Sequence, residues 1–135
     1  MPAIPLTPEL LVLAGSVALL VVQILLQAGL ATRELGLDWN ASPRDAGLKP
    51  DGVLAGRAER ALKNLLETYP AFVGLVLALA ITGHTGGLGF AGAAAWLVAR
   101  IVYVPLYLAG VPVVRSLAWV ASLAGLLAML AALVV

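Results

Sequence analysis

The sequence has no cysteine and only one histidine in 135 residues. Without cysteine the chain forms no disulfide, no thiolate nucleophile and no cysteine-based metal site, so a thiol that takes part in chemistry must come from another molecule. His84 stands alone in a glycine-rich turn and lacks companions at metal-ligand spacing. We therefore expect no metal site.

Charge is also scarce. Charged residues make up 11% of the chain, hydrophobic residues make up 62%, and the mean hydropathy is +1.05. A soluble domain of this length has no core large enough to hide so much apolar surface. The net charge of +1, without a basic patch, gives no sign of a nucleic-acid partner. We predict a single all-α integral membrane domain over residues 1–135.

Four apolar segments are long enough to cross a bilayer, because about twenty such residues span the ~30 Å hydrocarbon layer as a helix. Thr7 is the predicted N-cap of the first span, and Glu9 suits the helix dipole there. A cleavable signal peptide is the alternative, but no Lys or Arg precedes this run and it is too long for a signal. The predicted fold is a four-transmembrane-helix bundle with a polar cytoplasmic connection over 33–56 and spans over 9–32, 57–82, 88–109 and 112–134.

Much of the charge lies at the start of the second span. Arg60, Lys63, Asn64 and Glu67 follow i, i+3, i+4, i+7 spacing and therefore share one helix face. The apolar part after Glu67 is only about fifteen residues, or ~22 Å, which is too short to cross the membrane. The polar turns must enter the membrane, where charged side chains face a bundle interior or a cavity. Pro70 just beyond them predicts a kink.

The third and fourth spans carry polar residues as well. Arg100, Tyr103 and Tyr107 lie at i, i+3, i+7, and Arg115 and Ser116 open the fourth span. A guanidinium beside the unpaired N–H groups of a helix start favours an anion. The pattern predicts a cationic pocket for a small molecule that carries carboxylates or a thiolate. The alternative is that these charged groups form ion pairs and extend to the membrane interface.

All the Lys and Arg residues lie in or near the first and third connections. By the positive-inside rule these connections are cytoplasmic, and both termini lie outside the cytoplasm. The compact chain, without retention signals, leads us to expect a bacterial inner membrane.

Taken in order, these motifs resemble the MAPEG family, the membrane-associated proteins in eicosanoid and glutathione metabolism, in a bacterial-type member. The resemblance rests on Arg60-x-x-x-Asn64-x-x-Glu67 with Pro70, on Arg100-x-x-Tyr103-x-x-x-Tyr107, and on Arg115-Ser116, and it covers nearly the whole chain. It implies a homotrimer with glutathione sites between neighbouring subunits near the cytoplasmic side.

The resemblance also implies a function. Arg115 matches the arginine credited in enzymatic members with stabilising the thiolate of glutathione, the thiol cosubstrate. The expected activity is that of a membrane transferase or peroxidase acting on a hydrophobic electrophile, which would arrive through a lipid-facing groove. Matching positions imply these further glutathione contacts: Arg33, Arg60, Asn64, Glu67, Arg100, Tyr103, Tyr107 and Ser116.

Two residues depart from the pattern of enzymatic members. Lys63 stands where some have an arginine, and Trp119 stands where some have a tyrosine. A non-catalytic member that binds lipid or a partner protein is therefore the main alternative. A small transporter or channel is a third, although three of the spans lack the midplane breaks expected of secondary transporters.

Overall fold

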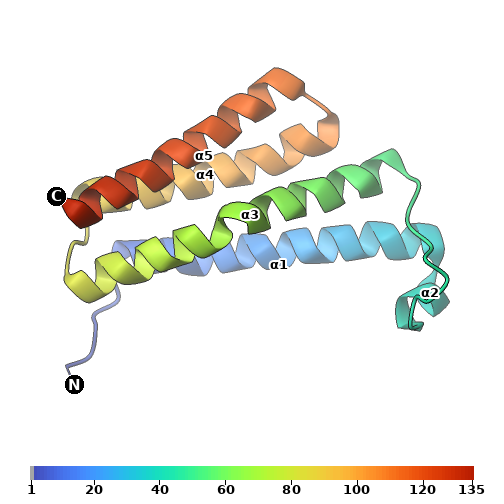
Figure 1. The fold of residues 1–135 in the computed structure, drawn as a ribbon, viewed down its shortest axis with the longest axis horizontal. Coiled ribbons are helices and arrows are strands. Elements are labelled where there is room, and N and C mark those ends of the chain that lie inside the picture. Colours follow the sequence, from blue (N-terminus) through green and yellow to red (C-terminus); the bar gives the residue numbers. More distant parts are fainter. Residues whose placement is uncertain (1) are drawn as a thin grey trace.

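The computed structural model describes residues 2–135 as an assembly of helices (Figure 1). Four long helices are each apolar enough to cross a membrane. This confirms the all-α fold and an integral membrane protein with four candidate spans. The helices are α1 Pro8–Leu35, the short α2 Leu37–Ala41, α3 Val53–Thr82, α4 Gly87–Ala109 and α5 Pro112–Val134.

The start of α1 forms as its sequence predicts, with one addition. The backbone N–H of Leu10 donates to Thr7 Oγ1 at 3.3 Å, and Pro8 occupies the first helical position. Glu9 is fully buried, and its carboxylate accepts a hydrogen bond from the backbone N–H of Gly86, directly before α4. Glu9 therefore stabilises the starts of two helices, because its negative charge lies in the first turn of α1 and also at the positive end of the α4 dipole.

The connection between α1 and α3 is more ordered than a simple polar loop. The Arg44 guanidinium lies 4.4 Å from the ring centre of Trp39, which lies within the short helix α2. Glu34 Oε1 accepts hydrogen bonds from the backbone N–H groups of Asp51 at 2.7 Å and Gly52 at 2.8 Å. These contacts bring the chain back to the start of α3, which begins at Val53, before the expected position 57.

Two helix pairs make up the bundle. Figure 1 shows α1 beside α3 and α4 beside α5, with the α4–α5 turn spread away from α3. Gly92 of α4 and Gly125 of α5 bring the second pair into backbone contact, since a Cβ on either would lie 2.6 Å from the carbonyl oxygen of the other. Small residues at a helix–helix interface permit such close packing. The α4–α5 pair is therefore tightly joined.

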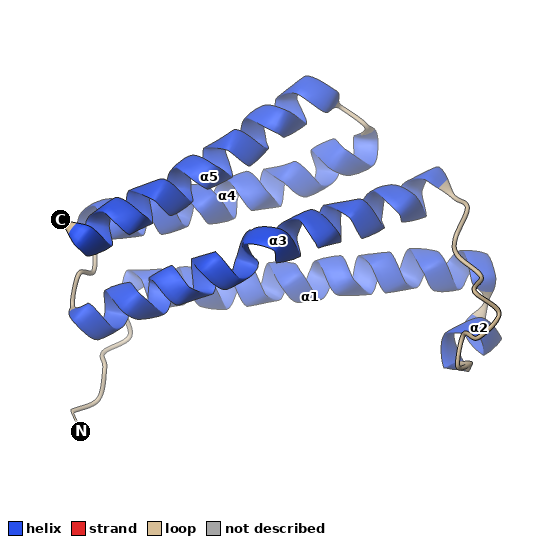
Figure 2. Ribbon diagram, in the orientation of Figure 1, coloured by secondary structure: helices blue, strands red, loops and turns tan. Residues whose placement is uncertain are grey.

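Aromatic rings join α3 to α4 at mid-bundle. Phe72 and Trp96 are fully buried and stack with ring centres 3.8 Å apart, and the Tyr69 ring lies 6.0 Å from Trp96. The Tyr69 hydroxyl also meets the Ser16 hydroxyl of α1 at 2.9 Å. Figure 2 shows an irregular turn near the middle of α3, the helix that contains Pro70, as expected where proline removes a backbone hydrogen bond. These side chains fill the centre of the bundle. The polar residues of α3, α4 and α5 lie between this core and the α4–α5 turn.

Candidate functional site

A cavity of about 410 Å³ lies between α3, α4 and α5. Its volume is within the ~300–1,000 Å³ range of small-molecule sites. The second span provides four of its lining residues, the third provides two and the fourth provides one: Arg60, Lys63, Asn64, Glu67, Tyr103, Tyr107 and Arg115. The polar faces predicted separately for three spans thus meet in one place.

Tyr107 joins the two arginines of this cavity. Arg60 Nε donates to the Tyr107 hydroxyl at 3.3 Å, and the Arg115 guanidinium lies 4.7 Å from the centre of the same ring. The Tyr103 ring packs beside it, with the two ring centres 5.5 Å apart. A cation over an aromatic face is attracted by the ring quadrupole, so Tyr107 holds Arg115 in place without neutralising it.

The charge of the lining is unbalanced. Arg60, Lys63 and Arg115 are cationic, and Glu67 is the one carboxylate among the lining residues. Arg115 also lies in the first turn of α5, where the backbone N–H groups carry the positive end of the helix dipole. The arrangement favours a ligand with more negative than positive groups.

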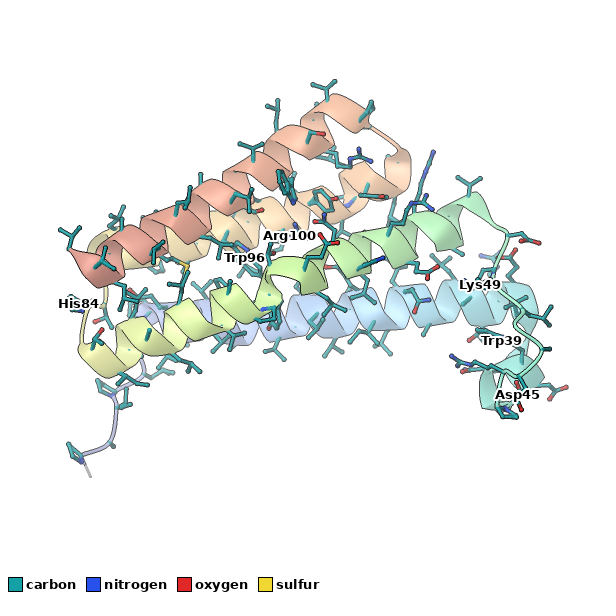
Figure 3. The ribbon with its side chains drawn as sticks, viewed as in Figure 1. Trp39, Asp45, Lys49, His84, Trp96 and Arg100 are labelled. Atoms are coloured by element: carbon teal, nitrogen blue, oxygen red, sulfur yellow. The ribbon has the colours of Figure 1, made fainter. Side chains whose placement is uncertain are left out.

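Arg100 lies behind the cavity wall. It is 1% exposed, and Figure 3 shows it at the centre of the bundle between the two helix pairs. Its Nη1 donates to Asn64 Oδ1 at 2.8 Å, and its guanidinium lies 4.5 Å from the centre of the Tyr103 ring. The structure therefore places Arg100 in contact with two lining residues, which it orients, and outside the lining itself.

A second cavity of about 160 Å³ adjoins the first. It shares Asn64, Tyr103 and Arg115 with the larger cavity and adds Ser116 and Trp119. The Ser116 hydroxyl donates to the backbone oxygen of Pro112 at 2.9 Å, so its single proton points along its own helix. In the sequence, Trp119 is notable only because it lacks the hydroxyl of the tyrosine that some enzymatic members have. In the structure its side chain forms part of the wall of the second cavity.

The remaining predicted contact does not join the others. Arg33 lies in the last turn of α1 with an exposed side chain and lines neither cavity. Among residues 2–135 there is no group of three or more histidine and acidic side chains that could hold a metal ion. Seven of the nine predicted site residues line one or both cavities, Arg100 supports two of them, and Arg33 stands apart.

The order of these residues along the chain is the pattern of a known family. A sequence profile of the MAPEG family matches residues 12–135. The chain belongs to the MAPEG family. The match covers α3, α4, α5 and nearly all of α1, so every cavity-lining residue of this MAPEG protein lies within it. No match to a curated protein or to a solved structure was found.

Proposed function

We propose that this MAPEG protein binds glutathione in the 410 Å³ cavity and uses its thiolate against a hydrophobic electrophile, as a transferase or a peroxidase. One observation carries the proposal: Arg60, Lys63 and Arg115 share a single cavity with Glu67. Glutathione has two carboxylates, one ammonium group and a thiol. Three cations therefore match its two carboxylates and its thiolate, and Glu67 matches its ammonium group.

Arg115 is the proposed catalytic residue. A thiol reacts as its thiolate, and an opposite charge close by lowers the thiol pKa by stabilising the anion. Arginine stays protonated and cannot act as a base, so the thiol proton leaves to solvent while the guanidinium holds the sulfur anion. In transfer, the sulfur forms a bond to an electrophilic carbon while a leaving group departs from that carbon with its electron pair, or the sulfur adds to an activated double bond whose displaced electron pair takes up a proton from solvent. In the peroxidase reaction, two glutathione thiols reduce a hydroperoxide to an alcohol and water and become a disulfide.

We propose further that the protein works as an oligomer, with the trimer of the family as the expected state. Arg60, Lys63 and Glu67 have exposed side chains in the single chain. Charged side chains within a membrane face protein or water because contact with lipid is costly. A neighbouring subunit over this face would cover them, with the cavity toward the cytoplasm of a bacterial inner membrane and both termini on the opposite side.

A second candidate function has its own support. The Ser116 proton is donated to Pro112, and Trp119 offers no hydroxyl. Arg115 would then have little help in stabilising a thiolate, as in a non-catalytic member that binds a lipid or a partner protein. Under this alternative the cavity binds a ligand without turnover.

Glutathione titration combined with a conjugation assay distinguishes the two. The protein in detergent is titrated with glutathione by calorimetry, and conjugation of a generic aromatic electrophile is followed for the wild type, Arg115→Ala and Arg44→Ala. We expect Arg115→Ala to lower the rate at pH 7 by about 10- to 100-fold. Arg44→Ala, a matched change in the connection outside both cavities, should leave it unchanged. Absence of binding at millimolar glutathione would exclude the enzyme, and binding without turnover would favour the second candidate.

A further inference from the structure

Arg57 connects α3 to the far end of α4. It lies one turn before Arg60 on α3 and lines neither cavity. Its Nη1 donates to the backbone oxygen of Leu108 at 3.0 Å, and its side chain is partly buried. From the sequence alone, this residue is simply one more basic group near the membrane surface.

The carbonyl that Arg57 binds is one that the end of α4 leaves free. Gly110 N–H bonds to the Tyr107 oxygen at 3.1 Å, and Val111 N–H bonds to the Leu106 oxygen at 3.0 Å. This pair of bonds, with Gly110 in the left-handed region at φ 74°, is a Schellman motif. It satisfies two of the last four helix carbonyls but not that of Leu108. The guanidinium binds that carbonyl and lies at the negative end of the helix dipole.

Gly110 also makes room for the Arg57 guanidinium, because glycine has no Cβ. A Cβ at Gly110 would lie 2.7 Å from Arg57 Nη2 and 2.9 Å from its Cζ, so the guanidinium occupies the space that any other residue would need. Gly83, which ends α3, also has a positive φ of 75°, but nothing lies within 4 Å of its added Cβ. The close approach at Gly110 is therefore a feature of the arginine contact and not of helix-ending glycines in general.

The contact crosses the gap between the two halves of the site. Figure 1 shows α3 and the α4–α5 turn spread apart at this end of the bundle. Arg60 also crosses the gap through its 3.3 Å bond to Tyr107, but Arg60 lines the cavity, where a ligand would compete for its guanidinium. Arg57 lines neither cavity, so a ligand there would not compete for its bond to the Leu108 carbonyl.

We propose that Arg57 is a positioning residue that sets the distance between the α3 side of the site and the α4–α5 side. Tyr107 directly precedes Leu108, and Arg115 stands in the first turn of the next helix. Because the Gly92–Gly125 contact joins α4 to α5, the bond at Leu108 places both residues relative to Arg60. Its effect on catalysis rests on the proposed function, whereas its effect on the helix spacing does not.

The first test measures the spacing without glutathione. The chain lacks cysteine, so spin labels can be attached at Glu59→Cys on α3 and Val113→Cys on α5, both exposed positions. Labelled subunits are diluted with unlabelled ones, and the label–label distance is measured by electron spin resonance. Arg57→Gln should lengthen and broaden the distribution, Arg57→Lys should change it less, and the matched loop variant Arg44→Gln should match the parent. An unchanged distribution in Arg57→Gln would overturn the proposal.

The second test measures the bound thiol. We expect Arg57→Gln to raise the thiol pKa of bound glutathione by about one unit and to weaken glutathione binding about 10-fold, with recovery in Arg57→Lys. A purely structural role would lower the melting temperature and leave the thiol pKa unchanged, which would contradict the proposal. If the wild type does not bind glutathione, the proposed function fails and the spacing measurement still decides the role of Arg57.

If Arg57→Gln does not fold, Gly110→Ala compared with Gly83→Ala provides the same test. Both changes place a Cβ at a positive φ, but only the one at Gly110 meets the guanidinium. The label–label distance should change in Gly110→Ala and not in Gly83→Ala. Equal distances in the two variants would overturn the proposal.

Discussion

Replacing Arg115 with glutamine removes the one charge that lines both cavities and leaves a shorter, uncharged polar side chain. The guanidinium is held 4.7 Å from the Tyr107 ring centre, so its position is defined before a ligand binds. An opposite charge within about 4–6 Å lowers the pKa of an acid by about 1–3 units. From an ordinary thiol value of about 8.5, the pKa of bound glutathione should fall to about 5.5 to 7.5 in the wild type. In Arg115→Gln its thiol pKa should return to about 8.5.

The pH dependence of kcat/KM for the electrophile, measured at saturating glutathione, reports this shift, because the reacting species is then the complex that holds the bound thiol. At pH 7 the variant should react about 10-fold or more slowly, because less of its bound thiol is ionised. Its rate should approach that of the wild type near pH 9, where both thiols are mostly ionised. Arg115→Lys should lie between them, since it keeps the charge but loses the planar group over Tyr107. Equal midpoints in wild type and Arg115→Gln would refute the electrostatic role of Arg115.

Three further changes test the helix packing and the site. Gly125→Ala places a Cβ within 2.6 Å of a backbone oxygen, so it should destabilise the protein by about 1–3 kcal/mol, measured by thermal melting in detergent. In the control Gly74→Ala, the added Cβ meets nothing within 4 Å, and this change should be neutral or stabilising. Glu9→Ala removes the acceptor for Gly86 N–H and should cost about 1–2 kcal/mol in the same assay, with greater amide exchange at the start of α4. Tyr107→Phe removes the hydroxyl but keeps the ring under Arg115, so glutathione affinity by calorimetry should fall only a few-fold and the thiol pKa should stay as in wild type. A stable Gly125→Ala, an unchanged Glu9→Ala, or a shifted thiol pKa in Tyr107→Phe would each contradict the corresponding contact.

The number and type of helices could be predicted because span length and hydropathy depend on local sequence. Helix periodicity also placed Arg60, Asn64 and Glu67 on one face, and the structure keeps them together. The helix that contains the predicted second span, residues 57–82, begins before that span. The four preceding residues, which begin with Val53, also form helix, and the Glu34 contacts that return the chain to that point arise only on folding.

Contacts between helices could not be predicted, because they depend on how each helix is rotated and where it crosses its neighbours. The spacing of Arg100 is compatible with lining the pocket, yet its side chain turns behind Asn64. The Ser16–Tyr69 and Arg57–Leu108 hydrogen bonds join residues 53 and 51 positions apart, and no local pattern marks them. The glycine turn at Gly110 was visible in the sequence, but the carbonyl left free beside it was not.

The most direct test of the central claim is the number of protons released when glutathione binds. Calorimetric titrations of the wild type at pH 7 are run in buffers with different ionisation enthalpies, with S-methylglutathione as a control that has no thiol proton. If the cavity holds glutathione as its thiolate, each binding event at pH 7 should release about 0.2 to 0.9 of a proton for a bound thiol pKa of about 7.5 to 5.5, and the control should release none. Absence of binding at millimolar glutathione, or binding with no proton release, would contradict the account.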